Sequence, residues 1–291
     1  MRVWTRKSKI CLFLAIFAAF ATVFFLIWLK TDWQMLEDER KGRDYKPSAA
    51  MTQIADELQL TRKGRAVFYA TKPTLQDSSQ FNQKCGKDDS ASYTLGCYYE
   101  DTDEHINIFD NGLDLFENDL ISYDFRAQRS VATLHEMLHA VYARLDNQAE
   151  ICAELRPIVS SYPQMERELL LYNKSQYCTE AFARIGSEHA DALQDTSLAK
   201  IYNDYFTPNS NLIAKYSQNE TQLANLDSLF ANSRKNLKNE RSRVESLIAS
   251  QSSYANNAID NYNQLVLKHN ALAKELRAIY SNLDSGRAAS L

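Results

Sequence analysis

Five consecutive residues, His135-Glu136-Met137-Leu138-His139, combine residue types and a spacing that suit metal chemistry. On a helix, positions i and i+4 lie on one face, so the two imidazoles can reach a single metal ion. Glu136 follows the first histidine directly, and there its carboxylate can take a proton from a metal-bound water. The run therefore predicts two metal ligands and one general base.

The flanking residues predict the helix that this run needs. The segment from Phe125 to Leu145 contains no glycine or proline. Its leucine and valine residues recur at i, i+4, i+7 and i+11, and the two histidines fall on the stripe beside them. Asp124 is the predicted N-cap, because a short carboxylate there accepts hydrogen bonds from the first turn. The expected core stripe consists of Leu134, Leu138, Val141 and Leu145.

A third ligand must lie elsewhere in the chain. Catalytic zinc normally has three protein ligands and one open position for water. Taken alone, the residues downstream leave the choice open. For Glu180 the competing explanation is an ion pair with Arg184, one helical turn later on a solvated face. The candidates are Glu150, Glu154, Glu166, Glu168, Glu180, Glu188 and His189.

Two further segments resemble the gluzincin zinc metallopeptidases, including their aminopeptidase and thermolysin-like branches. The run Thr179-Glu180-Ala181-Phe182-Ala183 is similar to a short motif on a second helix, whose glutamate completes the metal site in those families. The run Leu95-Gly96-Cys97-Tyr98-Tyr99, followed by His105 to Phe109, resembles the sheet edge before their active helix. The resemblance covers residues 60 to 205, approximately.

The resemblance implies a zinc ion held by His135, His139 and Glu180, with Glu136 as the base in peptide-bond hydrolysis. Two neutral imidazoles and one carboxylate leave such a site with one net positive charge. That charge lowers the pKa of the bound water toward ~7. In this fold we expect the substrate peptide to add as a strand to the sheet edge near His105 to Phe109.

The chain departs from the family pattern in two respects. The 40 residues between His139 and Glu180 exceed the corresponding interval in the thermolysin branch. In addition, no tyrosine or histidine can be matched to the family's transition-state stabiliser, although the developing oxyanion needs a donor besides the metal. Tyr177 and His189 are the residues considered for that role, and both are explained equally well as ordinary residues of one helix.

Composition limits the class of protein. Apolar residues make up 45% and charged residues 24% of the 291 positions, which is typical of globular proteins. The net charge of −4 offers no basic excess to neutralise phosphates, so nucleic acid is not an expected partner. With only 7 glycines and 5 prolines, we expect a mostly helical α+β fold. In it, a small zincin-like sheet would pack on the active-site helix and on a second helix that carries the glutamate.

The N-terminal region has the pattern of a membrane anchor. Ile10 to Leu29 is an uncharged run of 20 residues, which is long enough to cross a bilayer as a helix. Basic residues precede it and acidic residues follow it, so residues 1–9 are expected in the cytoplasm. The chain would cross the cell membrane once, and the residues after the span would lie on its outer side. A cleaved signal peptide is the alternative, but the apolar run continues eight residues beyond the cleavage-like Ala19-Phe20-Ala21. Residues 30–47 are the predicted juxtamembrane stalk.

Cysteine positions agree with export. Cys11 lies within the span, and the other four cysteines follow it. An even number there predicts two disulfides, for which four cysteines allow three connectivities. We favour the local pairs Cys85–Cys97 and Cys152–Cys178, each expected to contribute ~3 kcal/mol.

Residues 48–207 are predicted to form the metallopeptidase-like domain. A short amphipathic helix is expected over 49–60, and further helices over 147–160, 165–172 and 179–185. Loop residues Glu100 to Glu104 are few enough for a hairpin between the second and third predicted strands. From Asn111-Gly112 onward the chain is expected to be helical. The three predicted strands are Arg65–Ala70, Tyr93–Tyr99 and His105–Phe109.

The last part of the chain, residues 208–284, reads as a long helical arm. It starts at a cap on Asn209 or Ser210, after Pro208. Apolar residues repeat every seven positions in two stretches, which an Asn- and Ser-rich gap at 250–257 separates. This pattern fits an antiparallel helical hairpin or one interrupted coiled coil, followed by a frayed tail at 285–291. The repeats are Leu223, Phe230, Leu237 and Val244, and then Leu265, Leu272 and Ile279.

Together these features predict a membrane-anchored zinc metallopeptidase whose substrate is a peptide or protein outside the cytoplasmic membrane. The helical arm would bind a protein partner or a second copy of the chain. Two alternatives stay open: a non-enzymatic tethered coiled-coil scaffold with a structural zinc, and a zinc amidase that acts on a cell-wall polymer. Glu136 separates the first alternative from an enzyme, because a structural zinc site needs no base.

Overall fold

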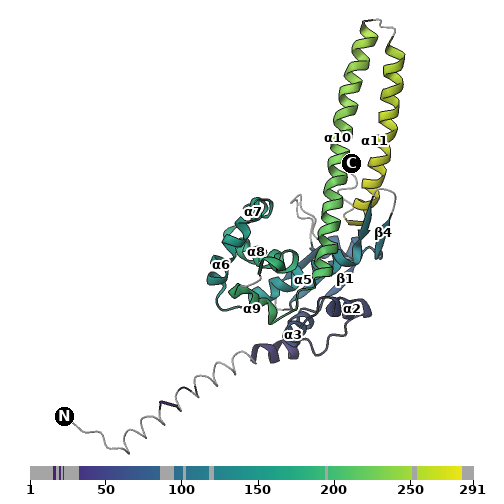
Figure 1. Ribbon diagram of the computed structural model, residues 1–291. Helices are drawn as coiled ribbons and strands as arrows, with labels where there is room; N and C mark the ends of the chain where they lie inside the picture. Colours follow the sequence, from purple (N-terminus) through teal and green to yellow (C-terminus); the bar gives the residue numbers. More distant parts are fainter. Residues whose placement is uncertain are drawn as a thin grey trace, which may run out of the picture.

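The computed structural model shows a rounded domain from which a long two-helix hairpin projects (Figure 1). The domain combines many helices with two small sheets. The predicted mostly helical architecture is therefore confirmed for the part of the chain described. The described residues are 16–17, 20, 22, 33–85, 95–100, 103–117, 121–193, 196–250 and 254–283.

Helix α5, Phe125–Ala143, runs through the centre of the domain. Its N-cap is Asp124, whose side chain accepts a hydrogen bond of 2.9 Å from the backbone N–H of Ala127, as predicted. Three residues of the predicted core stripe, Leu134, Leu138 and Val141, are buried. The fourth, Leu145, lies just beyond the end of the helix and packs half-buried against the same core.

Shorter helices pack around α5. Figure 1 shows α6, α7, α8 and α9 gathered on one side of the domain, with α2 and α3 at its lower end. The predicted helices at 49–60, 147–160, 165–172 and 179–185 are confirmed, with ends shifted by a few residues. They correspond to α2 (Ala49–Glu57), α6 (Gln148–Ser160), α7 (Pro163–Leu169) and α8 (Lys174–Glu188). The other helices around α5 are α3 (Arg62–Ala70), the 3₁₀ helix η1 (Ala190–Leu193) and α9 (Ser197–Asn203).

The prediction of a strand over Arg65–Ala70 is wrong, because these residues lie in α3. A short apolar run does not by itself distinguish a buried strand from a buried helix. The Thr61 hydroxyl accepts a hydrogen bond of 3.1 Å from the N–H of Gly64 and so caps a helix at this point. Val67 and Phe68 then turn into the core on one helical face.

The main sheet has three strands in the order β1-β3-β2. Strand β1 is Thr74–Gln76 and pairs parallel with β3, His105–Phe109. Strand β2, Gly96–Tyr99, pairs antiparallel with the other side of β3, which confirms the predicted hairpin. Because β3 is the central strand, both of its edges are occupied. The expectation that His105–Phe109 forms the edge to which a substrate strand adds is therefore wrong, and the edge strands of this sheet are β1 and β2.

Between α3 and α5, four short elements were not predicted. Strand β1 and helix α4, Ser78–Cys85, precede the β2–β3 hairpin. Strands β4 (Leu115–Glu117) and β5 (Ser122–Asp124) form a second, two-stranded sheet directly before α5. The chain therefore does not turn helical after Gly112 as expected. Three-residue strands carry no periodic signal and depend on the partners that they meet in the fold.

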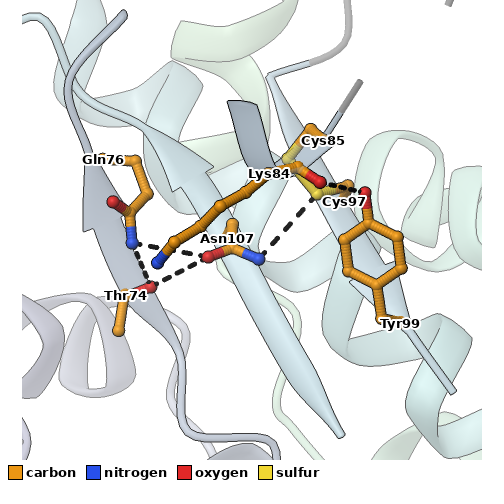
Figure 2. The surroundings of a disulfide bond; sticks show 7 residues. All are labelled: Thr74, Gln76, Lys84, Cys85, Cys97, Tyr99 and Asn107. Atoms are coloured by element: carbon orange, nitrogen blue, oxygen red, sulfur yellow. Dashed lines mark hydrogen bonds between the residues drawn. A yellow bond between two sulfur atoms is a disulfide. The ribbon is translucent and has the colours of Figure 1, made fainter. Parts of the chain in front are cut away.

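Both favoured disulfides are present, and each joins two elements of the domain. Cys85–Cys97 connects the end of α4 to the edge strand β2, with Cα atoms 5.7 Å apart. Figure 2 shows a polar group beside it, in which the amide of Asn107 accepts hydrogen bonds from Thr74 and Gln76. Cys152–Cys178 connects α6 to α8, with Cα atoms 5.2 Å apart.

The C-terminal arm is a hairpin of α10, Ser210–Ala249, and α11, Ala255–Leu283, rather than one interrupted coiled coil (Figure 1). Asn209 caps α10 through its side chain, as predicted. An apolar cluster at the base attaches the hairpin to the domain. It contains Ile121, Tyr123, Phe125, Leu223, Leu226, Leu276, Ile279 and Tyr280.

The predicted membrane span, Ile10 to Leu29, falls almost wholly outside the described residues, as do the predicted tails 1–9 and 285–291. Within the described residues, no helix combines the length and the apolar character needed to cross a bilayer. The predicted stalk is described from residue 33 onward. Its residues 33–41 are helical, and Asp38 among them is buried in the domain.

Candidate metal centre

Close packing of α8 against α5 brings the candidate ligands together. At Gly186 of α8, an added Cβ would lie 2.6 Å from the side chain of Leu138 on α5 and would overlap the ring of Tyr202. The absence of a side chain therefore permits this approach. One turn earlier, Phe182 stacks on Tyr202 at 4.4 Å between ring centroids, and the Tyr202 hydroxyl donates to the Phe182 carbonyl at 2.8 Å. These contacts fix the helix that carries Glu180.

His135, His139 and Glu180 converge on one point between the two helices. Nε2 of His135 lies 3.4 Å from Oε2 of Glu180, and Nε2 of His139 lies 3.6 Å from Oε1. The imidazole centroids are 4.8 Å apart, with their planes at 73°. All three side chains keep slight access to solvent, with exposed fractions of 19%, 13% and 19% in the order named.

These distances fit a small divalent cation. The ligand atoms of the three residues lie within 4.8 Å of one another. Zinc–nitrogen and zinc–oxygen bonds are ~2.0–2.2 Å, so neighbouring ligand atoms around a tetrahedral zinc are ~3.4 Å apart. Two imidazoles and one carboxylate are also donors that zinc accepts. The group could therefore hold a metal ion.

The same groups strongly perturb one another. Burial lowers the pKa of His135, but its hydrogen bond to Glu180 and nearby carboxylates outweigh this effect and raise the pKa to about 9. Burial and the charge of His135 lower the pKa of His139 to about 4. Burial raises the pKa of Glu180, but the two histidines more than compensate and lower it overall. A positive charge is therefore stabilised at the point where these three side chains meet.

Glu136 is not one of the converging groups and lies beneath the edge strand β2. It is 8% exposed, and the backbone N–H of Tyr98 donates to its carboxylate. Burial raises its pKa to about 7. A Cβ at Gly96 would stand 2.5 Å from Cγ of Glu136, so the strand can lie this close only because residue 96 is glycine. Gly96 and Tyr98 of β2 thus cover the carboxylate of Glu136.

Thr179 is a site residue whose role the sequence did not indicate. Its hydroxyl lies 2.9 Å from Nδ1 of His139. A hydrogen bond from the Nδ1–H to this hydroxyl leaves Nε2 of the ring free to bind a metal and fixes the ring plane. The available signal was its position directly before Glu180, since a residue next to one ligand can orient another ligand across the helix pair.

The other third-ligand candidates lie elsewhere or are paired. Glu150 is exposed, Glu154 accepts a hydrogen bond from Ser197, and Glu166 accepts one from Ser160. The competing partner of Glu180, Arg184, instead bonds Glu168 at 2.7 Å and pairs with Glu188 at 3.5 Å.

The two residues considered as transition-state stabilisers are occupied by ring contacts. The guanidinium of Arg156 lies over the ring of Tyr177, with its Cζ 5.5 Å from the ring centroid. His189 lies against Tyr162, with centroids 4.2 Å apart. Neither belongs to the three-residue group that could hold a metal.

Comparison of the chain with protein-family models, with curated proteins and with solved structures found no match. The resemblance to gluzincins consequently rests on the motif residues themselves, and the geometry of the three converging side chains is an independent observation.

Proposed function

We propose that this protein is a zinc metallopeptidase. The observation that carries the proposal is the convergence of His135, His139 and Glu180 on one point. A fourth residue, Glu136, is buried beside them and is not one of the three candidate ligands. A structural site needs only the ligands, whereas a hydrolytic site also needs a base. Zinc bound there would supply a water of lowered pKa and polarise the scissile carbonyl.

The residues of this chain would divide the remaining work. Glu136 would accept a proton from the attacking water and pass it to the leaving amine. The N–H of Tyr98 holds that carboxylate, and Thr179 holds His139. Strand β2 pairs with β3 on one side only among the described strands, so its second edge offers backbone groups to an extended peptide.

We further propose that the catalytic domain lies outside the cytoplasmic membrane and is held there by the span at Ile10 to Leu29. Two disulfides favour an oxidising compartment, because reducing cytosol disfavours such crosslinks. The basic residues before the span favour a cytoplasmic N-terminus.

The decisive experiment measures zinc and turnover in the same preparations. Purified full-length chain should contain about one zinc, and a peptide library should reveal cleavage. Glu136→Gln should keep the zinc and lose turnover by ~10²-fold or more, since it removes only the base.

Glu166→Gln is the matched control, because Glu166 bonds Ser160 on the surface, away from the ligands. It should keep both zinc and turnover. A Glu136→Gln protein with full activity would show that the proposed mechanism is wrong. A chain that binds zinc but cleaves no peptide would support the scaffold or amidase alternatives.

A further inference from the structure

The helix at 33–41 is docked onto the domain by a buried ion pair. Asp38 is 1% exposed and accepts hydrogen bonds from Nε of Arg144 at 3.1 Å to each oxygen, and from Nη2 at 2.9 Å. Arg144 is the C-cap residue of α5, and its Nη1 donates to the Ala140 carbonyl at 2.8 Å. Such a bidentate pair fixes orientation as well as distance. The juxtamembrane helix is thereby attached to the helix that carries both histidines.

The same guanidinium also reaches the β2–β3 connection. Nη2 of Arg144 donates to Glu104 at 2.7 Å. Glu104 immediately precedes β3, and its carboxylate also accepts Nζ of Lys41 at 3.2 Å and the hydroxyl of Tyr98 at 3.2 Å. The side chain of Tyr98 is therefore held by this network, while its backbone N–H holds Glu136.

Burial makes Asp38 the sensitive member of the network, because its side chain is 1% exposed. Arg144 pairs with two carboxylates, Asp38 and Glu104, whereas Lys41 pairs with Glu104 and, at 3.8 Å, with Glu37. Loss of the Asp38 charge leaves a buried guanidinium with one acidic partner. The side chain of Arg144 then has only Glu104 and the Ala140 carbonyl as partners, so Glu104, which accepts the hydroxyl hydrogen bond of Tyr98, is held less rigidly.

We propose that Asp38 is a positioning residue for Glu136, acting through Arg144 and Glu104 on Tyr98. This inference rests on the proposed function, in which Glu136 is the general base. It implies that a residue outside the predicted domain 48–207 controls where that base lies. The consequence is that the membrane-proximal helix belongs to the catalytic domain and is not a spacer.

The test compares Asp38→Asn with Glu39→Gln in the zinc-loaded full-length protein. Glu39 is the adjacent residue, and it forms an exposed ion pair with Arg62 on α3. Asp38→Asn should lower kcat between ~10-fold and ~100-fold, because small misplacements of reacting groups have effects of that size. Zinc content should stay at about one per chain. Glu39→Gln should keep wild-type kcat.

Amide hydrogen exchange supplies a readout that general destabilisation would not reproduce. In Asp38→Asn, the amides of β2, Tyr98 in particular, should exchange ~10-fold faster, while amides in α5 and α8 keep their protection. A purely structural role would instead speed exchange in all three elements and leave kcat per zinc-loaded chain unchanged.

Glu104→Gln is the second variant, because Glu104 lies nearer the surface and its loss breaks the same connection. If Asp38→Asn fails to fold, Glu104→Gln must show the loss of kcat and the faster exchange of Tyr98. Wild-type kcat and protection in the folded variants would overturn the inference while leaving the peptidase proposal intact. If the wild-type protein cleaves no peptide, the proposed function fails, and exchange at Tyr98 still decides whether Asp38 controls β2.

Discussion

The domain and the hairpin bury their side chains in different ways. Around α5 one continuous apolar core extends from α2 to α10 and encloses the charged groups of the candidate metal centre. In the hairpin, continuous burial is confined to the base, where Leu223 and Leu226 meet Tyr123 and Phe125. Farther out, Val244 is the one buried residue of α10.

This difference shows what each part needs. Metal ligands must be held in fixed positions, so they require densely packed surroundings. The distal hairpin holds no such group in the described residues, and its surface can vary without disturbing the centre. A protein partner or a second copy of the chain, bound through these helices, stays a prediction. Substitutions in the two regions should therefore have separable effects, and four experiments address that separation.

The largest effect is expected from removal of a ligand. Glu180→Ala should weaken zinc binding by ~100-fold or more, because two histidines alone hold zinc poorly. A competition titration against a chelator measures this change. Glu245→Ala on the exposed face of the hairpin should leave the affinity unchanged. Wild-type affinity in Glu180→Ala would remove Glu180 from the centre but would leave the two histidines in place.

Loss of the α6–α8 crosslink comes next. Replacing Cys152 and Cys178 together with serine should lower the free energy of unfolding by ~3 kcal/mol, as read from denaturant titration. It should also weaken zinc binding by a smaller factor than Glu180→Ala, because the helix of that ligand becomes less constrained. The matched control replaces Cys85 and Cys97, whose loss should affect stability similarly and zinc affinity less. Equal zinc affinities in the two variants would contradict the proposed link.

The joint between the two regions should show a moderate effect. The amide of Asn219 on α10 is buried and bonds the backbone of Asp124 twice, accepting from its N–H at 3.0 Å and donating to its carbonyl at 2.8 Å. Asn219→Ala removes both hydrogen bonds from a buried site and should destabilise the protein by ~1–3 kcal/mol. Asn236→Ala, on the exposed part of the same helix, should change stability by less than ~0.5 kcal/mol. Thermal unfolding compares the two.

A pH titration should detect the smallest effect, in the network around Arg144. Burial raises the pKa of Glu104, but the opposite charges of Arg144 and Lys41 outweigh it and lower the pKa below the ordinary 4.5. Its contribution to stability is therefore present above that value and is lost as the pH falls through the lower, folded-state value. Glu104→Gln should remove this part of the acid dependence of the unfolding free energy. An unchanged acid limb in Glu104→Gln would show that the network adds nothing.

Local signals explain why the centre could be predicted. The helix around His135 follows from its period and from the cap at Asp124, both of which act within a few residues. Glu180 could be selected only through the resemblance, since spacing alone does not specify which helices meet. The role of its neighbour Thr179 was not predicted, because the hydrogen bond to His139 joins two helices and only the position directly before Glu180 indicated it.

The elements that were missed depend on distant partners. Strand β5 is completed by Asn219, 95 residues later than Asp124, and β1 is defined by its pairing with β3. Hairpin and single coiled coil share one heptad pattern, and the choice was made by packing of the base on Tyr123 and Phe125. The sheet edge was misplaced for the same reason, because strand order is set by tertiary contacts.

The docking of Asp38 limits how far the domain can lie from the membrane. Asp38 lies nine positions after Leu29, and residues 33–41 are helical. With the proposed anchor in a bilayer, a chain of that length reaches about 20 Å from the membrane surface to the docking point. A linker this short would give peptides attached to the same membrane a high effective concentration at the candidate metal centre. The proposed enzyme would thus favour substrates attached to the same membrane near its anchor, whatever the amino-acid sequence at their cleavage site.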